Sequence, residues 1–429
     1  MSYVLGLKCK ECGHRTAASP VHVCEQCFGP YEVEYDYAAM KGKVTRESIA
    51  KGPHSLWRYK DLLPVNTPVT GFHSGMTPLR RADRLAKELG CRELYIKDDS
   101  CNYPTYSYKE RVVSVAISKA KEFGFDTVGC ASTGNLANST AAHAAIAGIK
   151  CYVMIPHDLE TGKVLGSLVF GPNMVRIKGN YDDVNRLCTE IADKYGWAIV
   201  NVNLRPYYTE GAKTFGFEIA EQLGWRLPQH TISPVAGGTI LPKIYKGYQE
   251  LIELGLVEDT GAKIYGAQAA GCNPVVTALH KGSDIIEPQK PNTIAKSIAI
   301  GNPADGYYVW HAVKDSGGWG ESATDGEIVD AIRLLARTEG IWTEPAGGTT
   351  LACTIKLLQQ GRINKDESIV VCVTGNGLKT HEVVQDALPY PRVINAKLAE
   401  FDELVAETAA NANGKPAAVS ALEPALAAV

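Results

Sequence analysis

The sequence predicts an α/β fold with mostly parallel β-sheets. Short apolar runs alternate with longer amphipathic runs between about residues 94 and 373, which is typical of parallel strands joined by helical crossovers. Polar or glycine-rich stretches follow several of the apolar runs, as expected where strands end in loops at one edge of a sheet. These observations indicate two three-layer α/β domains, each with its sheet between helices.

The composition is that of an ordinary globular protein. The chain has 429 residues, of which 45% are hydrophobic and 21% are charged, so it has room for two or three domains. The formal net charge of −3 gives no electrostatic reason to expect binding to nucleic acid or to an anionic membrane. No apolar run approaches the roughly 20 residues that span a bilayer, and residues 1–8 resemble neither a signal nor a transit peptide. We therefore expect a cytoplasmic protein.

Residues 1–40 predict a small zinc-ribbon-like segment. Cys9 and Cys12 form one C-x-x-C pair and Cys24 and Cys27 form another, with eleven residues between the pairs. Tetrahedral zinc takes four thiolates presented by such turns, and a closed shell of protein ligands gives the metal a structural role. Two redox pairs, or a relic that has lost its metal, are the alternatives. The twelve cysteines of the whole chain are too sparse for a disulfide scaffold.

The remaining elements follow from hydrophobic periodicity. Residues 41–92 form a leading region with short helices at 46–50 and 83–89. The predicted strands are 94–97, 127–131, 151–155, 174–177, 198–200, 231–235, 263–268 and 368–373. The predicted helices are 110–123, 136–147, 162–170, 181–195, 239–254, 325–339 and 348–360. From Ala396 the sequence becomes alanine-rich, which predicts a tail helix followed by a poorly ordered end.

Lys109 is the residue on which the functional prediction depends. It lies between a polar loop, residues 102–107, and the helical run 110–123. The positive end of the helix dipole and the neighbouring Arg111 both disfavour a second charge, which lowers the cost of deprotonation. A neutral lysine amine can attack a carbonyl carbon. A solvated surface lysine is the alternative, and three loops further along the chain argue against it.

The first loop offers a site for a small anion. Ser132, Thr133 and Asn135 open the helix that follows strand 127–131. Amides at a helix N-terminus bind anions such as a carboxylate, and the two hydroxyls add hydrogen-bond donors. A simple N-cap is the alternative, since these residue types are also good caps.

The other two loops complete the set of groups that one cofactor needs. Residues 235–239, Val-Ala-Gly-Gly-Thr, could close around a phosphate in front of a helix. Thr374 follows the last strong strand, at the carboxyl edge of a parallel sheet where ligands bind. A tight turn is the alternative for each loop. Together with the reactive lysine, these loops predict pyridoxal phosphate, whose aldehyde takes the lysine and whose phosphate takes the glycine loop.

The chain resembles the threonine synthase family of pyridoxal-phosphate enzymes, which share the tryptophan synthase β-subunit fold (fold type II). The resemblance covers about residues 5–390. It is carried by Ser-Tyr-Lys-Glu-Arg at 107–111, Ala-Ser-Thr-Gly-Asn at 131–135, Arg-Pro-Tyr-Tyr-Thr-Glu-Gly at 205–211, Ile-Ala-Lys-Ser at 294–297 and Val-Thr-Gly-Asn-Gly-Leu-Lys at 373–379. Beside the lysine the family usually reads Thr-Gly-Ser-Phe-Lys-Asp-Arg. Tyr106 and Tyr108 therefore add bulk and hydroxyls here.

The resemblance implies a role for each site residue. Lys109 would form the Schiff base, Asn135 would hydrogen-bond the ring hydroxyl oxygen of the cofactor, and Thr374 would face its pyridine nitrogen. The backbone amides of Ala236, Gly237, Gly238 and Thr239 would bind the cofactor phosphate, and Ser132, Thr133 and Asn135 would bind the substrate carboxylate. The candidates for binding the substrate phosphate are Lys163, Asn203, Arg205 and Lys213. Arg205 is favoured because its planar fork suits phosphate.

The implied reaction converts O-phospho-L-homoserine and water into L-threonine and phosphate. The implied assembly is a homodimer whose only other partner is a small phosphorylated amino acid. The implied domains are the cysteine segment at 1–40, a large cofactor-binding domain from 41–104 and 206–395, a small domain at 105–205, and the tail at 396–429.

Two other functions compete with this one. A paralogue such as cysteate synthase, which combines O-phosphoserine with sulfite, would look broadly similar. A non-catalytic binding or regulatory protein could use the cysteine segment alone, but the intact Lys109, Asn135 and Thr374 argue against it.

Overall fold

The chain divides into a large unit and a C-terminal unit. The computed structural model describes residues 3–132, 134–157, 161–179, 181–389 and 391–412. The large unit is Met1–Val383 and the C-terminal unit is Val384–Val429. Helix α16 in the latter spans Leu398–Ala412, which confirms the predicted tail helix. The end predicted to be poorly ordered, residues 413–429, lies outside the described residues. Within the described ranges, no helix is both long and apolar enough to cross a bilayer.

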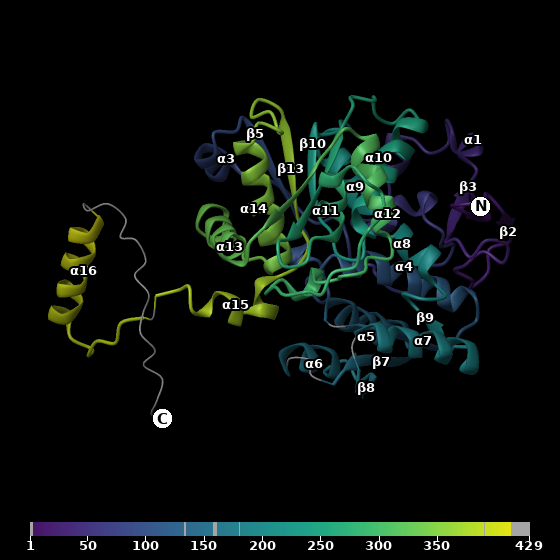
Figure 1. The fold of residues 1–429 in the computed structure, drawn as a ribbon, viewed down its shortest axis with the longest axis horizontal. Coiled ribbons are helices and arrows are strands. Elements are labelled where there is room, and N and C mark those ends of the chain that lie inside the picture. Colours follow the sequence, from purple (N-terminus) through teal and green to yellow (C-terminus); the bar gives the residue numbers. More distant parts are fainter. Residues whose placement is uncertain (1–2, 133, 158–160, 180, 390, 413–429) are drawn as a thin grey trace. The chain divides into compact units, whose positions relative to one another are not determined.

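The main sheet of the large unit has the strand order β12-β11-β10-β13-β5-β4 and is called the large sheet below (Figure 1). Its strands are β4 (Leu79–Arg81), β5 (Glu93–Asp98), β10 (His230–Pro234), β11 (Lys263–Ala269), β12 (Gly320–Ala323) and β13 (Ser368–Val373). Neighbouring strands are parallel, except for β4 against β5 at the edge. Every residue of β13 is buried. Burial on both faces explains why this strand reads as a continuous apolar run.

Helices cover both faces of the large sheet. Helix α14 (Pro345–Gln359) packs directly on β10 to β13, and α13 (Asp325–Glu339) lies against α14. Helix α3 (Asp83–Leu89) packs on β5 beside α13. Helices α10 (Ile240–Glu253), α11 (Pro274–Lys281) and α12 (Gly306–Asp315) pack on the other face, and α9 (Lys213–Gln222) lies against α10 (Figure 1).

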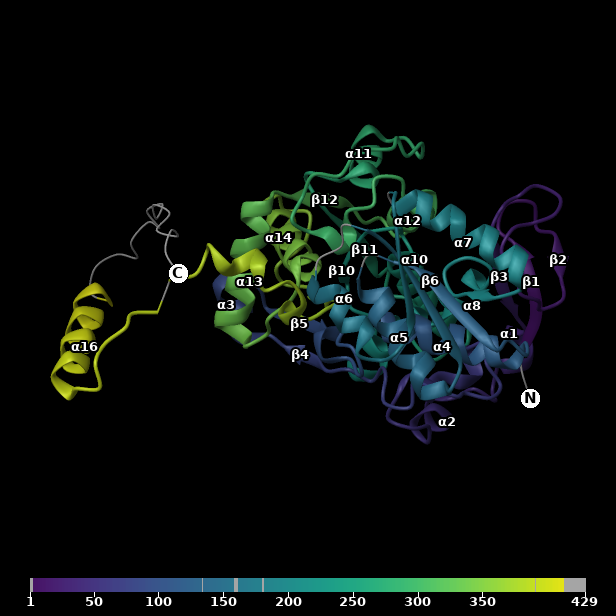
Figure 2. The same cartoon turned by 90° about the horizontal axis from the view of Figure 1, so that it is seen from below.

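A second sheet, the small sheet, has the order β8-β7-β6-β9, and all its neighbouring strands are parallel. Its strands are β6 (Thr127–Ala131), β7 (Lys150–Pro156), β8 (Asn173–Ile177) and β9 (Ala198–Ile199). Figure 2 shows α7 (Tyr181–Tyr195) on one side of β6 and α5 (Asn135–Ala147) with α4 (Lys109–Glu122) on the other. Helix α6 (Thr161–Leu168) lies beside α5.

The N-terminal sheet is antiparallel and joins β1 (Val4–Cys9) to β2 (Arg15–Thr16) and β3 (Tyr31–Tyr35). Strand β3 packs against α8 (Arg205–Glu210). The remaining short helices are α1 (Tyr37–Met40), α2 (Arg46–Ala50), η1 (Leu56–Leu62), η2 (Asp99–Cys101), η3 (Lys296–Ile298), η4 (Gly377–Thr380) and α15 (Glu382–Gln385).

The predicted fold class is confirmed. Parallel sheets lie between helices, and the predicted strand and helix cores match the observed elements to within a few residues. The predicted elements did not include the short strands β1 to β4 and β12 or the helices α1, α8, α9, α11, α12 and α15, and the predicted start of α14 was three residues late. Pro345 begins α14, a position where proline's fixed φ suits the first helical turn.

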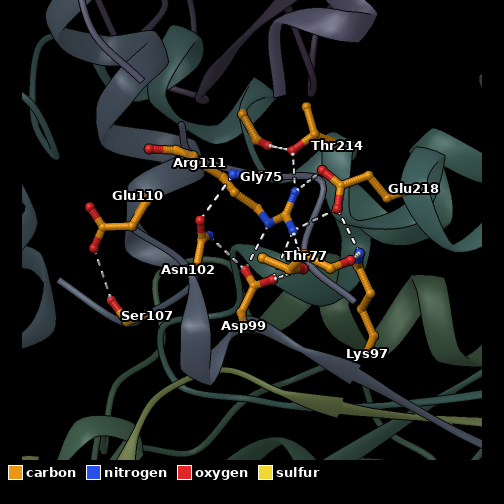
Figure 3. Close-up of polar contacts among 12 residues, drawn as sticks. Gly75, Thr77, Lys97, Asp99, Asn102, Ser107, Glu110, Arg111, Thr214 and Glu218 are labelled. Atoms are coloured by element: carbon orange, nitrogen blue, oxygen red, sulfur yellow. Dashed lines mark hydrogen bonds and ion pairs between the residues drawn. The ribbon is translucent and has the colours of Figure 1, made fainter. Parts of the chain in front are cut away.

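A buried ion network connects the helix of Lys109 to the large sheet (Figure 3). The guanidinium of Arg111 donates to Asp99 at 2.7 Å through both Nε and Nη2, and to Glu218 through Nη1 and Nη2. Lys97 donates to Glu218 at 2.6 Å. All four side chains are fully buried. Because two cations face two carboxylates, the network is neutral, which is what burial of charge requires.

Candidate active site

A cavity of about 280 Å³ lies where the two parallel sheets present the ends of their strands. Its walls include Ala131 at the end of β6, Pro234 at the end of β10 and Thr374 just after β13. Helices α4, α5, α10 and α14 begin at or beside residues of its wall. Helix N-termini carry partial positive charge and unpaired amides. The cavity is therefore built to receive an anionic ligand.

The cavity brings together most of the predicted site residues. Its lining includes Lys109, Ser132, Asn135, Lys163, Arg205, Ala236, Gly237, Gly238, Thr239 and Thr374. Thr133 lies outside the described residues. The Lys109 amine, the 236–239 loop and Thr374 border this one cavity, as binding of a single cofactor by all three needs.

Lys109 is the first residue of α4. Its Nζ donates a hydrogen bond to the Tyr208 hydroxyl at 3.2 Å and lies 4.8 Å from the centre of the Tyr108 ring. The side chain is half-buried and faces the cavity. Desolvation by burial lowers the pKa of Lys109 to about 8, although the negative charge of Glu344 opposes the shift. A substantial fraction of the amine is therefore neutral near physiological pH.

Thr374 is tied directly to the stretch before Lys109. Ser107 pairs with Gly375 in an isolated antiparallel bridge, and the Tyr108 amide donates to the Thr374 carbonyl at 2.9 Å. Among the described residues, none forms a hydrogen bond with the Thr374 hydroxyl, which is left to serve a ligand in the cavity. A neutral hydroxyl can donate to an unprotonated ring nitrogen.

The loop at residues 236–239 has the geometry of an anion site. Its amide groups donate to no residue that the structure describes, and helix α10 follows at Ile240. Gly238 has a φ of +96°, and a Cβ there would lie 2.8 Å from the Asp305 backbone. Only glycine fits that position. Unpartnered amides before a helix N-terminus suit a phosphate group, so this loop fits the predicted cofactor.

Asn135 lies in a chain of polar contacts that includes two residues absent from the predicted site. Its Nδ2 donates to both carboxylate oxygens of Glu344 at 3.0 Å, and its Oδ1 accepts from Lys379 Nζ at 3.0 Å. Burial raises the pKa of Glu344, while nearby Lys379 lowers it. A Cβ at Gly375 would lie 2.3 Å from a Glu344 oxygen, so this glycine is needed for the carboxylate to reach the cavity.

The N-cap alternative partly holds for Ser132. Its Oγ accepts hydrogen bonds from the amides of Gly134 at 3.1 Å and Ala137 at 2.9 Å, at the start of α5. The hydroxyl proton remains available for a ligand. Lys163, on α6, lies over this loop, since a Cβ at Gly134 would meet its Cδ at 3.3 Å.

Two of the candidates for the substrate phosphate prove to have other roles. The side chain of Lys213 is fully buried and pairs with Glu210 at 2.6 Å and Glu250 at 2.9 Å, away from the cavity. The Asn203 side chain accepts from the Ile199 amide and donates to the Trp197 carbonyl, which shapes the turn after β9. The structure therefore corrects both assignments. Arg205 lines the cavity and forms an ion pair with Asp305 at 2.7 Å.

The cysteine segment brings its four thiols together. Cys9 and Cys27 sulfurs are 3.5 Å apart, Cys12 and Cys24 sulfurs are 3.7 Å apart, and all four sulfurs lie within 4.8 Å of one another. Zn–S bonds of about 2.3 Å in a tetrahedron place sulfurs about 3.8 Å apart. The amides of Gln26 and Gly29 donate to Cys24 and Cys27 sulfurs at 3.4 Å, as thiolate ligands require. The donor set fits zinc.

The lowered pKa of Lys109 predicts how covalent attachment of the cofactor depends on pH. Between about pH 6 and pH 9, the attachment rate of metal-replete apoprotein mixed with pyridoxal phosphate should rise with a midpoint near pH 8 and approach its plateau at about pH 9, whereas a free lysine would have its midpoint at about pH 10.4. Stopped-flow absorbance measures the attachment rate.

Glu344→Gln removes the negative charge that opposes the lowering of the Lys109 pKa, so the pH profile of this variant should move to lower pH. Glu367→Gln, remote from the cavity, should leave it unchanged. A wild-type profile still rising steeply at pH 9 would contradict the assignment.

Comparisons with known proteins agree with this geometry. The sequence profile of the pyridoxal-phosphate dependent enzyme family matches residues 71–375. The chain is 38% identical over 404 residues to a threonine synthase of Methanocaldococcus jannaschii, covering 93% of this chain and 99% of that protein. It is 38% identical over 402 residues to a threonine synthase of Methanosarcina acetivorans, covering 93% of this chain and 98% of that one.

Solved structures give the same fold at low sequence identity. Diaminopropionate ammonia lyase from Escherichia coli superposes with a TM-score of 0.63 at 18% identity, covering 80% of this chain and 91% of that chain. Threonine deaminase isoform 2 from Solanum lycopersicum superposes with a TM-score of 0.61 at 19% identity, covering 80% and 92%. The profile match and the near-complete alignments with threonine synthases show that the chain belongs to the pyridoxal-phosphate dependent enzyme family, in its threonine synthase branch.

Proposed function

We propose that this protein is a pyridoxal-phosphate-dependent lyase that converts O-phospho-L-homoserine and water into L-threonine and phosphate. The observation that carries the proposal is one cavity bordered by the amine of Lys109, by the 236–239 loop and by the Thr374 hydroxyl. Burial lowers the pKa of that amine, and the loop amides bond to none of the described residues. The same cavity holds Arg205 and Lys163, which suit a second phosphate on the substrate. Relatives that align over 93% of this chain are named threonine synthase.

The residues divide the work between the two ligands. The amides of residues 236–239 would bind the cofactor phosphate, Thr374 would donate to its ring nitrogen, and Lys109 would bind it covalently between turnovers. When bound, the cofactor supplies an electron sink for charge that develops on the substrate carbons. Lys109, displaced by the substrate amine, would carry protons between the substrate Cα and Cβ. The Tyr208 hydroxyl, 3.2 Å from Nζ, would orient that amine.

The Glu344–Asn135–Lys379 chain would set the charge at the other side of the cofactor ring. Asn135 has both carboxylate oxygens of Glu344 as acceptors and Lys379 as a donor, so its orientation is fixed before any ligand binds. Ser132 would bind the substrate carboxylate with its remaining proton. Preorganised donors of this kind avoid reorganisation during the reaction.

We propose structural zinc at Cys9, Cys12, Cys24 and Cys27, supported by sulfur spacings close to those of tetrahedral coordination. Metal analysis of the purified protein should find about one zinc per chain, and substitution of the cysteines should remove it. A homodimer and a cytoplasmic location remain predictions.

One assay separates the proposed function from its alternatives. Purified holoenzyme is incubated with phosphohomoserine, or with phosphoserine plus sulfite, and both phosphate and the amino-acid product are measured. Threonine and phosphate in equal amounts support the proposal. Cysteate from the second mixture would support the paralogous activity, which the names of the relatives do not favour. Absence of product in both, without cofactor absorbance, would support a non-catalytic binding protein.

Arg205→Gln should raise KM for phosphohomoserine by about 10-fold to 100-fold, with a smaller change in kcat. The reason is the loss of charge-assisted hydrogen bonds to the substrate phosphate, each worth about 1.5–3 kcal/mol. Steady-state kinetics measure both constants. Arg226→Gln removes an arginine whose partner is Glu93, outside the cavity, and should change neither constant. An unchanged KM in Arg205→Gln would remove Arg205 from the substrate site.

A further inference from the structure

Tyr308, on α12, is held by the two residues between the first pair of cysteines. Its hydroxyl donates to the Glu11 carboxylate, and Lys10 Nζ lies 3.0 Å from the centre of its ring. Lys10 and Glu11 form the turn from Cys9 to Cys12, called the first cysteine turn below. A cation over an aromatic face and a hydroxyl bound to a carboxylate fix both position and rotation of the ring.

Tyr308 lies one helical turn from the active-site cavity. Helix α12 begins at Gly306, directly after Asp305. The Asp305 amide donates to the Gly237 carbonyl at 2.9 Å, and its carboxylate pairs with Arg205 at 2.7 Å. Asp305 thus contacts both the loop assigned to the cofactor phosphate and the arginine assigned to the substrate phosphate. Any shift of the start of α12 changes both sites.

Residues of the cysteine segment also lie close to Arg205. His22, Tyr31 and Glu32 line a gap of about 30 Å³ together with Arg205, Gly238 and Asp305. The Tyr207 hydroxyl, on the same helix as Arg205, donates to the Ser19 carbonyl at 2.9 Å.

We propose that the cysteine segment is a positioning element of the active site, and that its metal sets the affinity of the cavity for phosphate groups. Metal coordination closes the first cysteine turn, which carries Lys10 and Glu11. Those side chains fix Tyr308, and α12 transmits the restraint to Asp305 and from there to residues 236–239 and Arg205. Without metal, backbone hydrogen bonds such as Cys9 N to His14 O at 2.8 Å and Gly13 N to Cys9 O at 3.2 Å hold the turn, and the four thiols are not linked to one another. This inference rests on the proposed function for the identity of the phosphate sites.

The test measures binding of inorganic phosphate to cofactor-loaded protein by calorimetry, before and after a chelator removes the metal. In wild type, metal removal should weaken phosphate binding about fivefold or more, within the range of known couplings between sites. Tyr308→Phe loses the Glu11 contact and Tyr308→Leu also loses the contact with Lys10. With metal present, both variants should bind phosphate more weakly than wild type does. Removal of the metal should then lower their phosphate affinity by less than about twofold.

Tyr307→Phe is the matched control, because Tyr307 precedes Tyr308 on α12 and is 43% exposed. It should respond to metal as wild type does. A merely structural cysteine segment would lower thermal stability on metal removal without changing phosphate affinity, and that result would overturn the proposal. So would Tyr308 variants that respond to metal like wild type, or a protein that takes up no metal at the four cysteines. If Tyr308→Leu does not fold, the metal dependence of phosphate binding in Tyr308→Phe alone tests the proposal.

The failure of this inference and of the proposed function can be told apart. Phosphate binding requires no turnover. Metal-dependent phosphate binding in a protein that forms no threonine would support the inference and refute the proposed function. Threonine formation with a KM that does not depend on metal would support the proposed function and refute the inference.

Discussion

Lys109→Ala is expected to abolish covalent attachment of pyridoxal phosphate and to lower threonine formation by at least about 10³-fold. In the proposed function this side chain binds the cofactor and also moves protons at the substrate carbons, and removal of a group with two such roles typically costs this much or more. Borohydride reduction followed by mass spectrometry tests the attachment. A coupled phosphate assay tests the rate.

The fold should survive this substitution. Lys109 borders a cavity and donates its hydrogen bond to the Tyr208 hydroxyl, not to a carboxylate, so truncation leaves no carboxylate without a hydrogen-bond donor. Lys121→Ala, an exposed position near the far end of the same helix, is the matched control and should keep both attachment and activity. Covalent attachment that persists at another lysine in Lys109→Ala would contradict the assignment of the reactive amine.

Arg111→Met is expected to lower the free energy of unfolding by about 3–5 kcal/mol, the cost of leaving buried carboxylates without their cation. Arg111 forms ion pairs with both Asp99 and Glu218, and all three side chains are fully buried (Figure 3). Urea denaturation followed by circular dichroism measures the change. Arg15→Met removes an arginine that also makes a bidentate pair, with Glu34, but at the surface. It should change stability little, because exposed pairs are screened by water.

The same network predicts acid sensitivity. Burial alone would raise the pKa of Glu218, but the charges of Arg111 and Lys97 outweigh it and lower the pKa to about 2. An unfolded glutamate has a pKa of about 4.3. Because the folded-state pKa is depressed, the stabilisation is fully present above about pH 4.3 and is lost as pH falls toward 2. Arg111→Met should show a shallower loss over that window. Equal acid profiles in wild type and variant would contradict this account.

The sequence predicted the parallel strands well because burial on both faces leaves a strong signal. Strand β13, Ser368–Val373, is an almost unbroken apolar run and its predicted bounds match the observed ones. Strand β12, Gly320–Ala323, was missed because Gly-Glu-Ser-Ala has no apolar run. It is a strand because β11 offers a free edge to pair with, which is a tertiary effect.

The same distinction between local sequence pattern and tertiary contacts applies to the residues of the candidate site. Lys109, Thr374 and the 236–239 loop each follow a strand or open a helix, so local pattern was enough to find them. Lys213 looked like a phosphate ligand because nothing local shows that Glu250, on another helix, pairs with it. Lys379 ends the 373–379 motif, but the contact that it and Glu344 both make with Asn135 exists only in the folded chain.

The amides of residues 236–239, which bond to none of the described residues, have a consequence for the durability of the proposed phosphate site. A peptide N–H does not ionise in the physiological range, and every residue type except proline supplies one. The chain can therefore exchange Ala236 or Thr239 for other residues, or work in more acidic or more alkaline surroundings, and still retain this anchor. Substrate preference can drift through the side chains opposite while the cofactor's attachment point stays constant.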